Sequence, residues 1–238
     1  MAIGKDALEL QKYLEYEFKN IAYLDCALTH SSYTNEQRSR GVKAPSNERL
    51  EFLGDAVLGQ VISEYLFREF RNYREGALTK MRQHLVCEKT LSIIAKELSL
   101  GDYINIGRGE ELTDCRRRPK ILADSLEAII AAVYIDSRDG DIEAPRRLIE
   151  RLFRKEIDTL ATSQKTDYKT MLQQLAEQDG SAILEYRVVS ETGPEHEKSF
   201  TVIALMNNNE VGRGTAPTKK QAEMEAARLA LILFGVAL

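Results

Sequence analysis

Acidic residues recur at helical spacing in two separate segments of the chain. Glu48, Glu51 and Asp55 stand at positions i, i+3 and i+7, so on a helix all three project from one face. Asp124 and Glu127 stand at i and i+3 within a strongly apolar segment. Like charges stacked on one helix destabilise it, and ionised carboxylates among apolar residues are costly unless they are paired or bind a metal. The spacing therefore predicts that the two groups bind a divalent cation.

The ligand atoms in these segments indicate which cation and which chemistry to expect. Carboxylate and water oxygens suit Mg²⁺ or Mn²⁺. Such ions lower the pKa of bound water and stabilise the attacking and leaving oxygens of a phosphodiester. A solvated helix face is the commoner explanation for any one acidic residue, but the second pair, inside an apolar helix, favours a metal site. The three histidines are scattered and support no Ser-His-Asp arrangement.

The segments that must position these carboxylates have the apolar periodicity of helices. Helices are expected over residues 7–18, 47–70, 76–98, 120–134 and 143–159. The connections are expected at the polar, flexible residues 31–46, the break at 101–109 and the turn-rich residues 136–141. Ser46 or Asn47 is expected to cap the helix that carries the first acidic group.

A change of period after residue 160 indicates a second domain. Small polar residues at 161–166 form a candidate linker, which separates an all-α domain at 1–160 from a small α+β domain at 167–238. The expected order in the second domain is α-β-β-β-α, with a helix over 168–178, strands over 184–191, 199–206 and 211–216, and a helix over 218–234. Asn207, Asn208 and Asn209 are expected to form the turn between the last two strands.

Composition excludes several classes of protein. The three cysteines, Cys26, Cys87 and Cys115, are irregularly spaced, which argues against a disulfide framework or a thiolate zinc site and favours a cytoplasmic location. The chain has no apolar stretch long enough for a membrane span and no signal-peptide pattern. The net charge of −4 argues against nucleic acid as a partner unless the basic residues are locally clustered.

Three sequence motifs resemble a known family. NERLEFLGDAVL at 47–58 is similar to the signature of the ribonuclease III family. ILADSLEAIIAAVYID at 121–136 is similar to the family's second acidic motif, and YREGALTKMR at 73–82 resembles a third segment. The motifs occur in the family's order, and the resemblance covers essentially the whole chain and indicates the bacterial type.

The resemblance assigns roles to individual residues. It implies that Glu51, Asp124 and Glu127 bind the metal, with Asp55 supporting the metal-water network as part of the catalytic group. It also implies that Glu48 and Glu75 border the cleft.

Phe52 lies between the carboxylates and resembles an aromatic residue that inserts into the partner subunit of a homodimer. An ordinary core aromatic is nearly as good an explanation for Phe52.

The C-terminal domain resembles a double-stranded RNA-binding domain. Such domains read two minor grooves of A-form RNA and the phosphates between them. The implied RNA contacts are Thr170, Gln173, Gln174, His196, Lys198, Lys219 and Lys220. Glu223 stands where many such domains have another lysine, and the domain has more acidic than basic residues. We therefore expect modest RNA affinity with strong salt dependence. The run from Arg116 to Arg118 is either a solvated loop or a further phosphate contact.

The combined expectation is a ribonuclease III acting as a homodimer on double-stranded RNA. It would use Mg²⁺, with Mn²⁺ as the alternative ion, and no organic cofactor. Staggered cuts would leave 5′-phosphate and 3′-hydroxyl ends on ribosomal, transfer and messenger RNA precursors. Two alternatives stay open: a catalytically silent protein that binds double-stranded RNA on the same fold, and a metal-dependent hydrolase of small phosphate esters.

Overall fold

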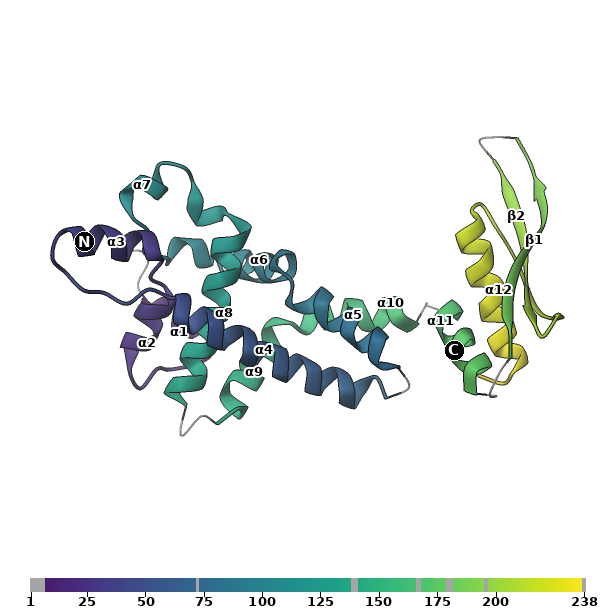
Figure 1. The fold of residues 1–238 in the computed structure, drawn as a ribbon, viewed down its shortest axis with the longest axis horizontal. Coiled ribbons are helices and arrows are strands. Elements are labelled where there is room, and N and C mark those ends of the chain that lie inside the picture. The colour runs from purple at the N-terminus through teal and green to yellow at the C-terminus, as the bar shows by residue number, and fades with distance from the viewer. Residues whose placement is uncertain are drawn as a thin grey trace. The chain divides into compact units, whose positions relative to one another are not determined.

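The chain divides into two compact units, Met1–Asp158 and Thr159–Leu238, shown as ribbons in Figure 1. The computed structural model describes residues 7–71, 73–137, 141–165, 168–178, 182–194 and 197–236. The first unit is helical and the second combines helices with a three-stranded sheet, so the expected fold class is confirmed. No helix in the described part of the chain combines the length and the apolarity that a membrane crossing requires.

Helices alone build the described part of the first unit. They are α1 (Ala7–Leu14), α2 (Ile21–Ala27), α3 (Ser31–Ser39), α4 (Glu48–Glu69), α5 (Glu75–Val86), α6 (Glu88–Glu97), α7 (Arg108–Glu111), α8 (Pro119–Asp136) and α9 (Glu143–Leu152), with short 3-10 turns at Leu100–Asp102 and Cys115–Arg117. Helix α10 (Arg154–Lys165) begins in this unit and ends in the next.

Helix α8 forms the centre of the first unit. It packs against α4 most extensively, and also against α6, α2 and α9. Leu126, Ile129, Ile130 and Val133 have no exposed surface, because α8 is surrounded by other helices on most of its circumference. Asp124 and Glu127, which are partly buried, therefore lie at the edge of a rigid, fully packed core.

The C-terminal end of α8 anchors the segment between α1 and α2. Asp136 is buried, and its carboxylate accepts hydrogen bonds from the Tyr16 hydroxyl at 3.0 Å and from the amides of Lys19 and Asn20 at 2.8 Å each. Burial, together with the Asp136 carboxylate, raises the pKa of Tyr16, so the hydroxyl stays a donor.

Residues 31–46, expected to be polar and flexible, contain helix α3, so that expectation is wrong for its first half. The His30 side chain caps α3 by accepting from the Ser32 amide at 3.2 Å. The Ser32 hydroxyl in turn accepts from the Gly107 amide at 3.0 Å. The local cap and the contact with the distant Gly107 segment together stabilise a helix that the local sequence does not favour. Helix α2 was not expected either.

Three expected helices break or end well before their predicted ends. The helix expected over 76–98 is two helices, because the backbone at Cys87 is extended. The helix expected over 143–159 is interrupted at Phe153, between α9 and α10. Helix α1 ends at Leu14 because Glu15 adopts a left-handed conformation with φ of 51°.

The second unit is a three-stranded antiparallel sheet with two helices. Its elements are α11 (Tyr168–Gln178), β1 (Leu184–Thr192), β2 (Ser199–Met206), β3 (Asn209–Ala216) and α12 (Lys219–Leu233), in strand order β1-β2-β3. Helix α12 packs on β3 and β2 and against α11. A side chain at Gly212 or Gly214 would overlap the backbone of α12, so these glycines allow helix and sheet to approach closely.

The turn between β2 and β3 is shorter than expected. Asn207 and Asn208 have left-handed φ values of 51° and 63°, while Asn209 is already paired with Met206 in the sheet. Asparagine tolerates this conformation better than most residues, so two residues suffice for the turn.

The segment expected to link the domains is helical over most of its length. Helix α10 continues through residue 165, and residue 166 lies outside the described residues. Small polar side chains are compatible with a helix when no glycine or proline interrupts them, and residues 161–166 contain neither.

Candidate functional site

A direct contact between the backbones of α4 and α8 builds the site. A side chain at Gly54 would overlap the backbone carbonyl of Glu127. Only a residue without a Cβ allows this approach. Gly54 follows Glu51 by three residues and precedes Asp55, so the contact brings the acidic groups of the two helices together.

Three carboxylates meet at this crossing. Glu51, Asp124 and Glu127 each offer one oxygen, and these oxygens all lie within 4.8 Å of one another. All three side chains are partly buried. The two segments that the sequence predicted to share a cation therefore do lie together in the fold. We call Glu51, Asp124 and Glu127 the acidic cluster.

Asp55 and Glu48 flank the acidic cluster on α4. Asp55 is exposed, and its negative charge acts on both Glu51 and Glu127. Glu48 accepts a hydrogen bond from the Ser46 hydroxyl at 2.9 Å, and its charge acts on Glu51. Asn47 precedes the first turn of α4, but its side chain makes no capping hydrogen bond.

The acidic cluster has more negative charge than its surroundings neutralise. Burial, followed by the charges of Asp55, Asp124 and Glu51, raises the pKa of Glu127 from 4.5 to about 8. Burial and then the charge of Asp124 also raise the pKa of Glu51. A raised pKa means that ionisation is unfavourable without an additional cation.

The acidic cluster fits a hard divalent cation. Its donors are all carboxylate oxygens from rigid helices, and such ligands suit Mg²⁺ or Mn²⁺ rather than softer metals. Burial and then the neighbouring carboxylates raise the pKa of Glu127, and a bound cation would offset both effects by favouring the ionised form.

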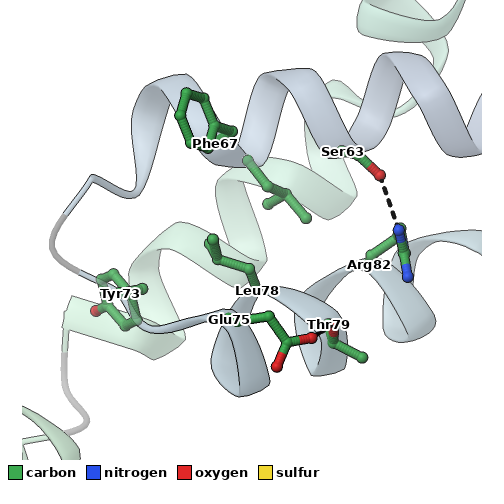
Figure 2. A pocket seen from close by; sticks show the side chains of 8 residues that line it. Ser63, Phe67, Tyr73, Glu75, Leu78, Thr79 and Arg82 are labelled. Atoms are coloured by element: carbon green, nitrogen blue, oxygen red, sulfur yellow. Dashed lines mark hydrogen bonds between the residues drawn. The ribbon is translucent and has the colours of Figure 1, made fainter.

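Glu75 lies away from the acidic cluster, in a cavity of about 510 Å³ between α4 and α5 (Figure 2). Its carboxylate accepts a hydrogen bond from the Thr79 hydroxyl at 2.7 Å. On the facing helix, Ser63 accepts from the Arg82 guanidinium at 3.1 Å. The cavity is lined by Ser63, Leu66, Phe67, Tyr73, Glu75, Leu78, Thr79 and Arg82. A single copy of the chain therefore does not bring Glu75 to the acidic cluster.

Phe52 is a surface residue. It lies on α4 between Glu51 and Asp55, and 81% of its surface is exposed. The alternative that Phe52 is an ordinary core aromatic is therefore wrong. Phe67, on the same helix, is also highly exposed. Phe52 therefore presents an apolar side chain to solvent and not to the core of its own unit.

The basic residues expected to contact RNA lie at the start of α12 and near the start of β2. Lys219 and Lys220 are exposed at the N-terminus of α12, where Thr218 caps the helix by accepting from the Gln221 amide at 3.2 Å. Lys198, near the start of β2, donates to Glu191 at 2.7 Å.

Helix α11 carries the remaining described RNA-contact candidates. Gln173 is exposed and donates to Glu177 at 2.7 Å, while Thr170 and Gln174 are partly buried. His196 lies outside the described residues.

The arginine run before α8 is mostly used within the fold. Arg116 donates to the Gly101 carbonyl at 3.2 Å and to Glu111 at 2.8 Å. Arg118 donates to the Thr113 hydroxyl at 2.7 Å. Of the three, Arg117 is the most exposed.

Two residues of the site, Gly54 and Lys120, were not predicted from the sequence. Gly54 sits in the middle of a helix, where glycine is unfavourable, and this was a usable signal for a close helix contact. Lys120 stands four residues before Asp124, a spacing that allows an ion pair on a helix, and its ammonium lies 3.0 Å from Asp124 Oδ2.

Both units of the chain are similar to known protein families. Residues 20–156 match the Ribonuclease-III-like family, and residues 168–233 match the double-stranded RNA binding motif. Ribonuclease 3 of Listeria monocytogenes is 43% identical over 223 residues, which are 94% of this chain and 95% of that protein. Ribonuclease 3 of Geobacillus thermodenitrificans is 47% identical over 223 residues, which are 94% of this chain and 89% of that protein.

A solved structure shares the fold of the helical unit. The nuclease domain of ribonuclease III from Campylobacter jejuni, described as flexible in a region involved in dimer formation, matches with a TM-score of 0.57 and 42% identity. The match covers 63% of this chain and 97% of that domain. The chain belongs to the ribonuclease III family.

Proposed function

We propose that this protein is a metal-dependent endonuclease that hydrolyses double-stranded RNA. The observation that carries the proposal is the meeting of Glu51, Asp124 and Glu127 at the crossing of α4 and α8. Membership of the ribonuclease III family and the matched double-stranded RNA binding motif supply the substrate class.

Within the site, Glu51, Asp124 and Glu127 are the proposed metal ligands, and Asp55 completes the catalytic group. Mg²⁺, with Mn²⁺ as the alternative, would stabilise charge on the phosphodiester oxygens and lower the pKa of a water molecule. Asp55 is exposed beside the ligands, where its carboxylate can orient a water and accept its proton. Glu48 borders the same face of α4. Glu75 lies in a separate cavity of its own copy, so its proposed place at the border of the cleft requires the homodimer. The expected products are 5′-phosphate and 3′-hydroxyl ends.

The proposed active form is a homodimer in which each copy cuts one strand, which gives staggered cuts. Phe52 supports this proposal because it is exposed beside the acidic cluster, where insertion into a second copy would remove its apolar surface from water. The related Campylobacter jejuni domain is described in connection with dimer formation.

The second unit is proposed to hold the duplex. Thr170, Gln173 and Gln174 would contact one minor groove, His196 with Lys198 a second, and Lys219 with Lys220 the phosphates between them. The proposed boundaries are 1–160 for the catalytic domain, 161–166 for the linker and 167–238 for the RNA-binding domain.

Ribosomal, transfer and messenger RNA precursors with long stems are the proposed substrates. The proposed location is cytoplasmic, and the three cysteines, all free thiols, support a reducing compartment.

Incubation of the full chain with a long RNA duplex and Mg²⁺ tests the proposal. We expect cleavage that EDTA blocks and that produces 5′-phosphate ends. Tight duplex binding without products would instead identify a silent RNA-binding protein. Removal of residues 161–238 provides the second arm: a hydrolase of small phosphate esters would keep its full activity, whereas we expect cleavage of duplex RNA to fall.

A further inference from the structure

Lys120 is paired with one of the proposed metal ligands. It lies in the first turn of α8, four residues before Asp124. Its ammonium is 3.0 Å from Asp124 Oδ2 and 3.2 Å from Oδ1, so it faces both carboxylate oxygens. These are the oxygens that Asp124 would offer to a metal.

The charge of Lys120 extends to the rest of the acidic cluster. It lowers the pKa of Glu51 and of Glu127, against the larger effects of burial and of the neighbouring carboxylates. The hydrogen bond to Asp124 and then the charge of Asp124 raise the pKa of Lys120 itself. The side chain is therefore a permanent cation at neutral pH, located where the acidic cluster lacks positive charge.

This ion pair can open at small cost. The Lys120 side chain is 71% exposed, and a lysine ammonium sits on a flexible four-carbon stem. Ion pairs between exposed side chains contribute little free energy, because water solvates the separated charges well. A divalent cation has twice the charge of the Lys120 ammonium and binds several carboxylates at once. It would therefore displace Lys120 from Asp124.

We propose that Lys120 is a resident counter-ion of the acidic cluster, which a divalent cation must displace from Asp124, and that it thereby sets the metal concentration at which the site fills. This inference rests on the proposed function, because it takes the acidic cluster to be the metal site. Lys120 is a positioning residue in this scheme: it acts through Asp124.

Titration of the full-length protein with Mn²⁺, without RNA, tests the inference. Free Mn²⁺ is followed by its electron paramagnetic resonance signal at neutral pH. Lys120→Met removes the charge, and we expect it to tighten the Kd for Mn²⁺ about fivefold, which corresponds to about 1 kcal/mol. Lys120→Arg keeps the charge and can grip a carboxylate with two parallel hydrogen bonds, so we expect a Kd equal to or weaker than that of the wild type.

Lys155→Met is the matched control. Lys155 is 72% exposed, and its ammonium lies 2.7 Å from a carboxylate oxygen of Glu97, so the change removes a comparable ion pair outside the acidic cluster. We expect an unchanged Kd for Mn²⁺.

Thermal unfolding adds an independent measurement. Lys120→Met should lower the Tm of the metal-free protein, because the acidic cluster loses its counter-ion, yet enlarge the rise in Tm that Mn²⁺ produces. If Lys120→Met does not fold, Lys120→Gln takes its place, with the same expected results.

The outcomes separate this inference from the proposed function. A Kd for Lys120→Met that equals or exceeds the wild-type value overturns the role of Lys120. If Glu127→Gln abolishes Mn²⁺ binding in the same assay, the proposed metal site stands regardless. If the wild type binds no Mn²⁺, or if Glu127→Gln binds it as the wild type does, both proposals fail.

Discussion

The acidic cluster of the first unit and Glu191 of the second unit differ in what surrounds their carboxylates. Glu51 and Glu127 face other carboxylates at a helix crossing, and their pKa values are raised. Glu191, in the second unit, is paired with Lys198 at 2.7 Å, and the hydrogen bond from that lysine lowers its pKa. The first arrangement lacks positive charge that a ligand must supply, whereas the second already has it. Neutralising a member of the acidic cluster should therefore destroy cleavage, whereas neutralising Glu191 should improve RNA binding.

The strongest test of this contrast is Glu127→Gln. The change keeps the shape of the side chain but removes one carboxylate from the acidic cluster. We expect cleavage of duplex RNA to fall more than about a hundredfold, the upper range for residues that only support a metal ligand. Duplex binding should stay unchanged in a gel-shift assay. The control is Glu97→Gln, because Glu97 is an exposed acid paired with Lys155 outside the acidic cluster. Near-normal cleavage by Glu127→Gln would contradict the proposed site.

Gly54→Ala tests whether the helix contact positions the acidic cluster. The added methyl group overlaps the Glu127 carbonyl, so α4 and α8 must separate. Overpacking of this kind costs about 1–3 kcal/mol of unfolding free energy, and cleavage should fall with it. Gly59→Ala is the matched control on the same helix, because nothing lies within 4 Å of a Cβ there. It should stabilise the protein slightly, and equal urea midpoints for the two variants would refute the contact.

The pKa of Glu127 predicts how pH affects the metal-free protein. Below pH 4.5 the carboxyl is protonated in both the folded and the unfolded chain. Between 4.5 and about 8 the unfolded chain releases this proton while the folded chain retains it, so the free energy of unfolding falls as the pH rises. In EDTA, we expect the free energy of unfolding to fall between pH 5 and 8 by a few kcal/mol more in the wild type than in Glu127→Gln. Parallel stability curves would show that Glu127 is not responsible.

In the second unit, Lys219→Ala combined with Lys220→Ala should weaken binding without abolishing it. Each lysine that neutralises a phosphate contributes about one unit to the slope of log affinity against log salt, so we expect the slope to decrease by about 2. Duplex affinity measured at several salt concentrations gives this slope. An unaltered slope would remove both lysines from the interface.

The smallest expected effect is an increase in duplex affinity, whereas the other substitutions, apart from the controls, reduce function or stability. Glu191→Gln releases Lys198 from its ion pair, and the charge of Glu191 also acts on Lys219. Because exposed ion pairs are worth at most about 1 kcal/mol, duplex affinity should rise by no more than a few-fold. Glu210→Gln, which frees Arg213 on β3 instead, serves as the comparison. Weaker binding by Glu191→Gln would break the contrast between the units.

Much of the fold could be predicted because local patterns are strong where the function needs rigid elements. The apolar periodicity predicts helix α8. The spacing of the acidic residues predicts that they share one face on α4 and one face on α8, because this follows from helix geometry. Helix α11 and strand β2 have the expected bounds, 168–178 and 199–206. By contrast, α3 depends on contacts with the Gly107 segment, which local propensity does not encode.

The chemistry was harder to predict than the elements. Spacing grouped Glu51 apart from Asp124 and Glu127, but the distance between the groups depends on how closely two helices cross, which Gly54 decides. Spacing alone also gave no sign that Glu75 lies in a separate cavity between α4 and α5. The Lys120 pair was readable in principle, because i and i+4 positions of opposite charge are neighbours on any helix.

The carboxylate of Asp136 joins residues far apart in the chain, since its partner Tyr16 lies 120 positions earlier. A ribosome releases the N-terminal segment long before it releases the end of α8, so the first helices must wait for this contact during synthesis. Pairings between distant residues also slow folding. The C-terminal sheet closes through neighbouring strands and can form as soon as it emerges. We therefore expect the first unit to reach its final packing more slowly than the second unit, although the ribosome synthesises the first unit earlier.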